Sequence, residues 1–579
     1  MIFYGKASRR ASVAAALGEI AGWIGEAVTA PLPIERHAAW VSALVEAGGL
    51  AQGLADAEEE AEGASPSGSA LAMALCAAVA AVMGRSWDSA FAVLPDAVPA
   101  AVADALAALR NAPGCPEAVE IRRTEGFAHY AVYPEAHWQA AAALAAPRPT
   151  RVLGLRSIGT ALSAAAAAAL SAPAPRTARP SGHPFDRRVA LALALDIAER
   201  DAVWAIVDEG PGLSGSSMGA AADALGAAGV RADRILLLPG HAGPPGPRAS
   251  DAHRRLWATA RSAVVPFEDL AHDGARGVGA WVEDLAGAPL APPEDIAGGG
   301  WRRHAFADEA AWPAVDRQNE RRKYLVRGRR GSVVMRFAGL AGFGREKLRR
   351  ATMLAEAGYG IAPLGLRHGF LVEPWRDDLR PASPGGAGRT AVLSRLAGYL
   401  AFRARAFPAA PDDGASLDAL LAMARVNAGE ALGEDAAARA GDWAGRIPAL
   451  ARIARRVGVD GRLAPHEWLH DGAAVLLKTD ALDHCCGHDL VGCQDVAWDV
   501  AGAAVEWDLT HAEAEALRAA VARDGARCDP ELVAFFRLAY PAFRVGTLTM
   551  ALEREGGAEA ARLEAALRPQ VAALRRALA

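Results

Sequence analysis

The stretch VWAIVDEGPGLSGSSMGAAADALGAAGV, residues 203–230, decides the central fold of this chain. It runs from an apolar segment through two adjacent acids into a loop of glycines and serines, and then into an alanine-rich helix. A strand that passes in this way into a helix places the intervening side chains at the carboxyl edge of a parallel sheet, where open α/β folds bind ligands. The stretch therefore predicts an α/β domain with a ligand site at a strand end.

The loop after the strand has the chemistry of a phosphate site. A helix that begins near Ser217 offers unpaired N–H groups and the positive end of its dipole, and the nearby serines add hydroxyl donors. The two acids suit sugar hydroxyls or a hydrated magnesium ion. We expect a phosphorylated sugar to bind Asp208, Glu209, Gly212, Ser214, Gly215, Ser216 and Ser217. The alternative is a glycine-rich turn that only caps a helix.

The segment AIVDEGPGLSGSS, residues 205–217, resembles the phosphoribosyl-diphosphate motif of type I phosphoribosyltransferases. The resemblance implies that Asp208 and Glu209 hold the ribose hydroxyls, with magnesium nearby, and that Ser214–Ser217 cradle the 5-phosphate. Upstream, residues 152–170 resemble the family's first core strand and diphosphate loop. The diphosphate-binding residues implied by this second match are Leu155, Arg156, Ser157 and Gly159, with Arg156 as the fixed positive charge.

The resemblance implies a magnesium-assisted transfer of phosphoribosyl from its diphosphate to a small acceptor. The polar, proline-rich segment 171–188 would then be a flap that closes over the site. The segment 122–138 either lines an acceptor pocket or contains an aromatic strand at 129–133 that packs into the core. A rival function is a non-catalytic sensor of phosphoribosyl diphosphate or an assembly protein, because the same fold serves regulators.

Composition limits the other classes of function. The 579 residues include 62 Lys and Arg against 67 Asp and Glu, a balance that gives no reason to expect a nucleic-acid partner. Six cysteines and an N-terminus without an export signal suggest a cytoplasmic protein of bacterial-type composition. The uncharged segment 69–84 is rich in alanine and short for a membrane span, so we expect a buried helix and no membrane association.

Changes in composition and in the predicted pattern of helices and strands along the chain predict three regions and a multidomain fold. Residues 1–115 are expected to be helical, with an exposed connector at 55–69, and residues 116–295 to form the phosphoribosyltransferase-like domain. Residues 296–579 begin after a Pro- and Gly-rich segment and open with a hairpin at 321–337. This third region is expected to be an α+β domain of two lobes.

The third region resembles aminoglycoside phosphotransferases and choline kinases, which have a protein-kinase-like fold. By this resemblance Arg336 takes the place of the phosphate-binding lysine, Glu346 is its partner, and Asp480 is the metal-binding aspartate of a nucleotide site. The catalytic loop falls on DGRLAPHE, residues 460–467, which puts Arg462 at the catalytic aspartate. An arginine stays protonated and cannot act as a base. We therefore expect a pseudokinase that binds a nucleotide, another small molecule or a protein partner; a small-molecule kinase is the weaker alternative.

A cluster of cysteines and histidines occurs in DHCCGHDLVGCQD, residues 483–495. Thiolates and imidazoles are zinc ligands, but adjacent cysteines do not have the usual two-residue spacing. We expect a buried, redox-silent group in place of a zinc site at Cys485, Cys486, His488 and Cys493.

Overall fold

The computed structural model describes residues 8–61, 68–144, 149–191, 195–272, 274–383, 389–472, 476–487 and 491–579. Its N-terminal region is helical: β1 (Ser8–Ser12), α1 (Val13–Thr29), α2 (Pro33–Glu60), α3 (Gly68–Asp88) and α4 (Ala100–Arg110). The Ser12 side chain caps α1 by accepting a hydrogen bond from Ala15 N, and Pro33 starts α2. The connector expected at 55–69 is wrong in its first part, because α2 continues to Glu60.

The α/β region contains a parallel sheet in the order β4-β3-β7-β8-β9. Its strands are β3 (Thr150–Leu155), β4 (Arg176–Ala178), β7 (Val203–Val207), β8 (Ile235–Leu238) and β9 (Arg261–Ser262). The helices of this region are α5 (Glu125–Ala128), α6 (Pro134–Ala143), α7 (Gly159–Ala169), α8 (Ile197–Asp201), α9 (Ser216–Ala227), α10 (Asp251–Thr259), α11 (Phe267–Leu270) and α12 (Glu283–Ala286). A hairpin of β5 (Ser181–His183) and β6 (Asp186–Arg188) stands between β4 and β7 in the chain.

The aromatic strand expected at 129–133 is wrong. Residues 125–128 form α5, and α6 begins at Pro134, whose fixed φ suits the first turn of a helix. Between them Tyr133 is buried and donates a hydrogen bond to the carbonyl oxygen of His368 (2.7 Å). The apolar residues of this segment do pack into the core, but from a turn.

The C-terminal region has the two lobes expected of it. An antiparallel sheet in the order β10-β11-β12-β14-β13 packs beside α14 (Ala341–Glu356). Its strands are β10 (Glu294–Asp295), β11 (Lys323–Gly328), β12 (Gly331–Phe337), β13 (Gly365–Arg367) and β14 (Phe370–Pro374). Helix α13 (Arg302–Ala305) precedes β11 in the chain. The second lobe contains α15 (Arg389–Ala406), α16 (Leu417–Leu432), α17 (Glu434–Gly441), α18 (Ile447–Ile453), α19 (Ala497–Glu506), α20 (His511–Arg523), α21 (Pro530–Leu552) and α22 (Gly557–Leu578), with β15 (Arg380–Pro381), β16 (Trp468–His470) and β17 (Leu476–Lys478).

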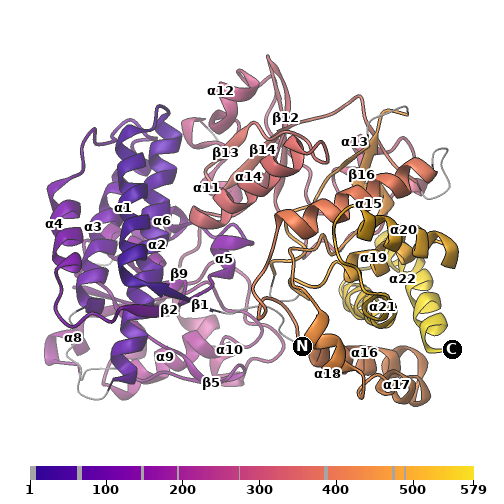
Figure 1. Cartoon of the computed structure of the whole chain (residues 1–579). Helices are drawn as coiled ribbons and strands as arrows, with labels where there is room; N and C mark the ends of the chain where they lie inside the picture. Colours follow the sequence, from indigo (N-terminus) through magenta and orange to yellow (C-terminus); the bar gives the residue numbers. More distant parts are fainter. Residues whose placement is uncertain are drawn as a thin grey trace.

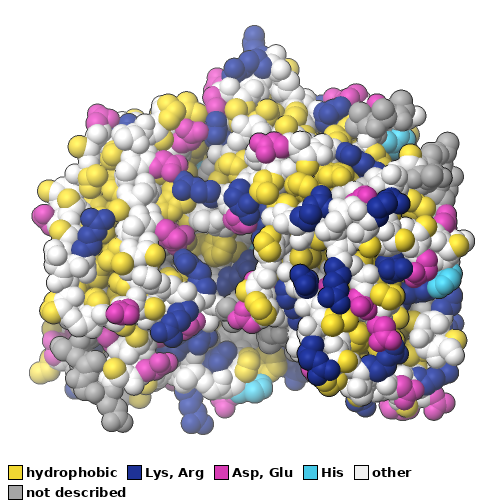
Figure 2. Space-filling view, viewed as in Figure 1, with side chains coloured by type: hydrophobic (Ala, Val, Ile, Leu, Met, Phe, Trp, Pro, Cys, Tyr) yellow, Lys and Arg dark blue, Asp and Glu magenta, His cyan; other side chains and the backbone are white. Residues whose placement is uncertain are grey.

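Figure 1 shows the N-terminal helices on the left, the antiparallel sheet and α14 at the top, and the helical lobe on the right. The face seen in Figure 2 is hollowed between the left and right parts, and several Lys and Arg side chains surround the hollow. The three regions of the chain are therefore arranged around a recess on this face.

One apolar core joins the regions on the left and at the top of the molecule. It includes Trp40 and Trp87 from the N-terminal helices, Val207 from one face of the parallel sheet, and Phe337 and Phe370 from the antiparallel sheet. The other face of the parallel sheet packs against α9 in a smaller core, and the helical lobe has its own. Burial of apolar area is the main stabilising term in folding, so the N-terminal helices and the two sheets depend on one another for stability.

Helix α3, among the described helices, has the length and apolar character of a membrane span, although 56% of its most apolar window is buried inside the protein. It packs against α2, α4 and α7, and its residues Leu75, Val79 and Met83 are fully buried. The burial expected for the segment 69–84 is present.

The close packing of α2 on α7 can be tested at Gly48. A Cβ atom added there would lie 2.7 Å from Ala161 Cβ and 3.1 Å from Ala161 backbone atoms. We expect Gly48→Ala to lower the free energy of unfolding by about 1–3 kcal/mol through overpacking. As a control, Gly22→Ala on α1 meets nothing within 4 Å and is expected to raise it by about 0.4–1 kcal/mol. Urea denaturation measures both; equal effects would contradict the shared core.

Candidate functional site

The acid pair lies where the sequence predicts, at the carboxyl end of β7. The strand ends at Val207, Asp208 and Glu209 follow, and the loop returns to the sheet through the hydrogen bond from Gly240 N to Glu209 O (3.1 Å). Burial raises the pKa of Asp208 to about 7. A carboxyl group held in this range changes charge near neutral pH, which is common at functional sites.

The serines after the acid pair form a cradle at the N-terminus of α9. Gly215 precedes the helix with a φ of 61°, a left-handed conformation that glycine adopts without strain. The hydroxyls of Ser214 and Ser216 both donate to the carbonyl oxygen of Pro184 (3.3 and 2.8 Å), and Ser216 N donates to Ser214 Oγ (3.2 Å). The two hydroxyls thus converge on one oxygen atom beside the start of α9.

That oxygen belongs to the hairpin of β5 and β6. Pro184 lies at its turn, between His183 and Asp186, which pair across it. The guanidinium carbon of Arg248 lies over the ring of the neighbouring Phe185, 5.5 Å from the centroid of that ring. The segment predicted to be a flap therefore touches the serine cradle directly.

The second predicted loop follows β3, and its arginine does not point to the cradle. Arg156 is buried and makes hydrogen bonds to Asp56 Oδ1 (2.9 Å) and to Glu59, both on α2. Arg179 binds Asp56 as well and donates to Ser157 Oγ (3.3 Å). Although burial opposes ionisation, these two guanidinium groups hold the pKa of Asp56 below its ordinary value. The acids of α2, which the sequence interpretation assigned to a connector, are thus part of this loop's surroundings.

The other residues predicted for the diphosphate loop, Leu155 and Gly159, flank the arginine at the end of β3 and the start of α7. A Cβ atom at 159 would lie 2.6 Å from Val207 O, so only glycine lets α7 approach the strand that carries the acid pair. The two predicted loops are therefore on adjacent strands, at the same edge of the sheet.

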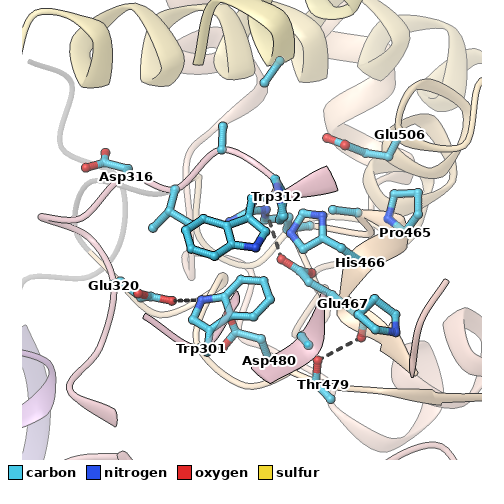
Figure 3. Close-up of a pocket in the computed structure, with 18 of the residues that line it drawn as sticks. Trp301, Trp312, Asp316, Glu320, Pro465, His466, Glu467, Thr479, Asp480 and Glu506 are labelled. Atoms are coloured by element: carbon cyan, nitrogen blue, oxygen red, sulfur yellow. Dashed lines mark hydrogen bonds and ion pairs between the residues drawn. The ribbon is translucent and has the colours of Figure 1, made fainter. Parts of the chain in front are cut away.

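A second candidate site is the cleft between the lobes of the C-terminal region, a cavity of about 1180 Å³. Figure 3 shows Trp301 and Trp312 at its centre, with His466 beside them. The indole of Trp301 donates to Glu320 Oε1 (2.7 Å) and stacks near the His466 ring, whose centroid is 6.1 Å away. Flat aromatic faces with charged groups at the rim suit a small molecule that has a ring or a cationic group.

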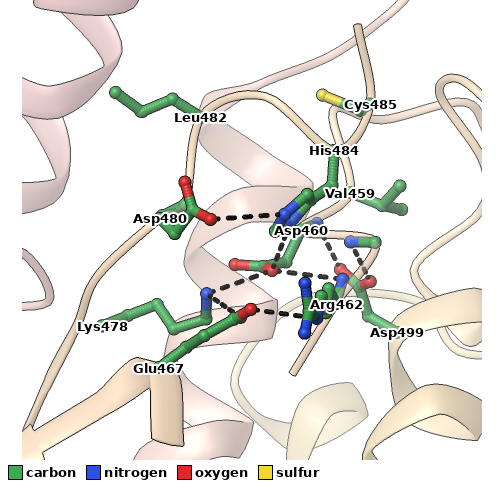
Figure 4. A network of polar contacts seen from close by, with 12 residues as sticks. Val459, Asp460, Arg462, Glu467, Lys478, Asp480, Leu482, His484, Cys485 and Asp499 are labelled. Carbon is green, nitrogen blue, oxygen red and sulfur yellow. Dashed lines mark hydrogen bonds and ion pairs between the residues drawn. The ribbon is translucent and has the colours of Figure 1, made fainter. Parts of the chain in front are cut away.

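The floor of the cleft is a network of charged side chains, drawn in Figure 4. Arg462 contacts Glu467 within the loop 460–467 (3.0 Å). The Lys478 ammonium lies 3.0 Å from Glu467 Oε2 and 3.4 Å from Asp460 Oδ1, so a cation supplied by the chain sits between two carboxylates. Asp499 anchors the loop by accepting hydrogen bonds from the backbone N–H groups of residues 460 and 461 (2.8 and 2.9 Å).

The expected pair of Arg336 and Glu346 is wrong. Arg336 contacts Asp480 (2.9 Å) and Glu373 (3.8 Å), while Glu346 makes its ion pairs with Arg349 and Arg350 on its own helix. The inward position on α14 belongs to the next residue, Lys347, which is buried and pairs with Asp483. One residue along an α-helix turns the side chain by about 100°, so a shift of one position exchanges the solvent and cleft faces.

The cysteine cluster surrounds a cation. The sulfur atoms of Cys485 and Cys486 are 3.7 Å apart, and Arg350 Nη1 lies 3.6 Å from Cys485 Sγ. Cys493 is partly buried, and His488 lies outside the described residues. A guanidinium group among the thiols competes electrostatically with a metal cation, so the described part of the cluster does not favour a zinc site.

Comparisons with known proteins give only distant likenesses. No family model and no curated protein matches the chain. Choline kinase LicA from Streptococcus pneumoniae is 15% identical, with 44% of this chain and 89% of that chain covered and a TM-score of 0.32. A choline/ethanolamine kinase family protein from Mesorhizobium loti is 17% identical (51% and 98% covered, TM-score 0.31), and macrolide 2'-phosphotransferase MphH from Brachybacterium faecium is 18% identical (46% and 95%, TM-score 0.29). At these scores the likenesses carry no argument about the role of any residue.

The charge of His484 at the floor of the cleft gives a pH test. Although burial disfavours the charged imidazole, the carboxylates of Asp460 and Asp480 raise its pKa to about 9. Because an unfolded histidine titrates near pH 6.5, about the value in model peptides, the stabilisation by this charge is full below that pH and is lost as the pH rises through 9.

We expect the difference in free energy of unfolding between the wild type and His484→Gln to shrink from about pH 6, below the pKa of the unfolded histidine, to about pH 10, above the pKa of the folded one. The matched control is His511→Gln, on an exposed position of α20 away from these carboxylates. Urea denaturation at three pH values measures both. A constant difference for His484→Gln would contradict a protonated imidazole in the folded protein.

Proposed function

We propose that the loops after β3 and β7 bind phosphoribosyl diphosphate, or a related sugar phosphate, and transfer its ribosyl group to a small acceptor. The observation that carries this proposal is the convergence of the Ser214 and Ser216 hydroxyls on Pro184 O at the start of α9. A carbonyl oxygen in this position stands in for a phosphate oxygen, which the same donors and the helix dipole would hold more strongly because it is charged.

The acid pair beside the cradle fits the rest of the ligand. Carboxylate oxygens accept hydrogen bonds from ribose hydroxyls, and they are also the ligands that Mg²⁺ prefers. Asp208 and Glu209 would therefore hold the sugar and, through it, a magnesium ion that neutralises charge on the diphosphate. Binding requires the hairpin to lift Pro184 from the cradle, after which the hairpin can close over the bound sugar and exclude water.

In the proposed reaction the bond between ribose C1 and the diphosphate oxygen breaks, and its electron pair leaves with the diphosphate. A nitrogen of the acceptor forms the new bond to C1 and loses its proton to solvent. The chain's own groups position the ribose and shield its electron-poor carbon; the half-buried Asp208 carboxylate stabilises the positive charge that develops on the ring. Arg156 reaches the diphosphate only if Asp56 and Glu59 release it.

The test of this proposal uses Asp208→Asn, which keeps the shape of the side chain and removes its charge. We expect binding of magnesium phosphoribosyl diphosphate to weaken roughly 10- to 100-fold, the cost of one or two charge-assisted hydrogen bonds, and diphosphate release to be lost. Because the pKa of Asp208 is about 7, wild-type affinity should rise from about pH 6 to about pH 8, and the affinity of the variant should not.

The matched control is Asp233→Asn, an exposed acid paired with Arg231 away from the loop, which leaves binding unchanged. Calorimetry gives the affinity, and a coupled assay with a panel of amines and bases gives diphosphate release. Binding without release would indicate the sensor; the absence of binding to the wild-type chain would refute both.

We further propose that the interlobe cleft binds a nucleotide or another small molecule without phosphoryl transfer. The observation in favour is the pair of Arg462 and Glu467, because the loop residue expected to accept a proton is a guanidinium group held by a salt bridge. Lys478 also contacts Glu467 (3.0 Å), which by the resemblance takes the place of the asparagine that helps to hold the metal ion of a kinase.

With ATP and a panel of small alcohols and amines, we expect binding to the full chain and no transfer of the γ-phosphate above the rate of a blank. Binding should fall with Arg336→Gln, which removes a buried cation of the cleft, and persist with Arg523→Gln on the exposed end of α20. Labelled γ-phosphate follows transfer. Transfer that is lost in Asp480→Ala would contradict this proposal and indicate a kinase.

A further inference from the structure

Three side chains that neither proposed site uses meet in the shared apolar core. His37 lies on α2, Glu135 on α6, and His368 in the turn between β13 and β14. Their exposed fractions are 0%, 0% and 3%. The two imidazole Nε2 atoms lie 3.0 and 2.7 Å from the same carboxylate oxygen, Glu135 Oε1.

Hydrogen bonding alone leaves polar atoms of this cluster without partners. His37 Nε2 is within hydrogen-bond geometry of Glu135 Oε1, but His368 Nε2 is not, although it is closer to that oxygen. Glu135 Oε2 and His368 Nδ1 are also buried without a hydrogen-bond partner among the described residues. A buried polar atom left in this way has lost its hydration without compensation, so Glu135 Oε2 and His368 Nδ1 need a physical explanation.

We propose that His37, Glu135 and His368 bind a divalent transition-metal ion of the zinc type. Two imidazoles and a carboxylate are the three protein donors of a zinc site of two histidines and one glutamate, and the unpartnered Glu135 Oε2 can add a second, weaker contact from the same carboxylate. With metal–ligand distances of about 2.0–2.2 Å, neighbouring donor atoms of such a site are about 3.3–3.5 Å apart. The imidazole nitrogens would therefore move away from the carboxylate by a few tenths of an ångström, to about that spacing.

One hydroxyl group beside the cluster supports His37 as a metal ligand. Ser86 Oγ lies 3.0 Å from His37 Nδ1, and when Nδ1 donates a hydrogen bond to this hydroxyl, Nε2 carries the lone pair that a metal ion needs.

The role of this site is structural. The rings of Trp87 and Phe91 pack against His37, and the Trp281 ring packs edge-on to His368 with centroids 5.0 Å apart. Because these aromatic side chains enclose the cluster, no open coordination position faces solvent for a substrate. The ion would join the N-terminal helices, α6 and the antiparallel sheet, and would have to enter while the chain folds.

The experiment uses the full chain produced in medium supplemented with zinc. We expect about one zinc per chain by mass spectrometry of the metal, consistent with one site. Anomalous diffraction at the zinc edge should place the ion between His37, Glu135 and His368. A wild-type chain without zinc, or one whose zinc lies elsewhere, overturns the proposal without any variant.

Variants separate the ligands from other groups. Glu135→Gln and His37→Gln remove donors, and the zinc content should fall at least tenfold, roughly the loss expected even of a supporting residue. Ser86→Ala keeps all donors and should weaken zinc affinity roughly tenfold while the chain stays folded. The matched controls are His484→Gln, in the cluster of Asp460, Glu467 and His484, and Cys486→Ser, and both should retain the metal. Loss of zinc in a control but not in Glu135→Gln overturns the proposal.

Discussion

The structure depends on the burial of one carboxylate, that of Glu135. Burial disfavours its charge, yet the two histidines beside it hold its pKa at about 2. A buried charge is tolerated only when its partners are in place, and breaking such a contact costs several kcal/mol. The partners here are His37 and His368, which are 331 residues apart in the chain. The N-terminal helices and the antiparallel sheet must therefore both dock on α6 before the charge is satisfied.

Much of the fold was predictable from sequence because local patterns determined it. Apolar runs bounded by glycines and acids located β3, β7 and β8, and the Arg-rich turn located the β11–β12 hairpin. The errors have physical causes: a proline at residue 134 starts a helix where aromatic residues had suggested a strand, and the run of acids after residue 55 continues α2. Alanine-rich composition also weakens the periodicity that separates helix faces.

The sites were predictable in position and less so in their contacts. Strand ends located the acid pair and the serines, because parallel topology brings loop residues to one edge. Contacts between distant segments left no local signal: the binding of Arg156 by Asp56, the convergence of the serines on Pro184, and the Glu135 cluster all join residues more than 29 positions apart. The one-residue exchange of Glu346 for Lys347 shows that helix registers cannot be assigned from a resemblance alone.

Both candidate sites are filled by the chain's own groups: a carbonyl oxygen occupies the serine cradle, and a lysine ammonium occupies the space between the cleft carboxylates. The N-terminal helices and both sheets also share one apolar interior. A fragment of a protein is stable alone only if it buries its own apolar surface. A chain cut near residue 116 would therefore leave a fragment whose part of the apolar core is exposed to water. The residues that line this interior, from the N-terminal helices to β14, are therefore expected to fold, and to tolerate dissection, only as one unit.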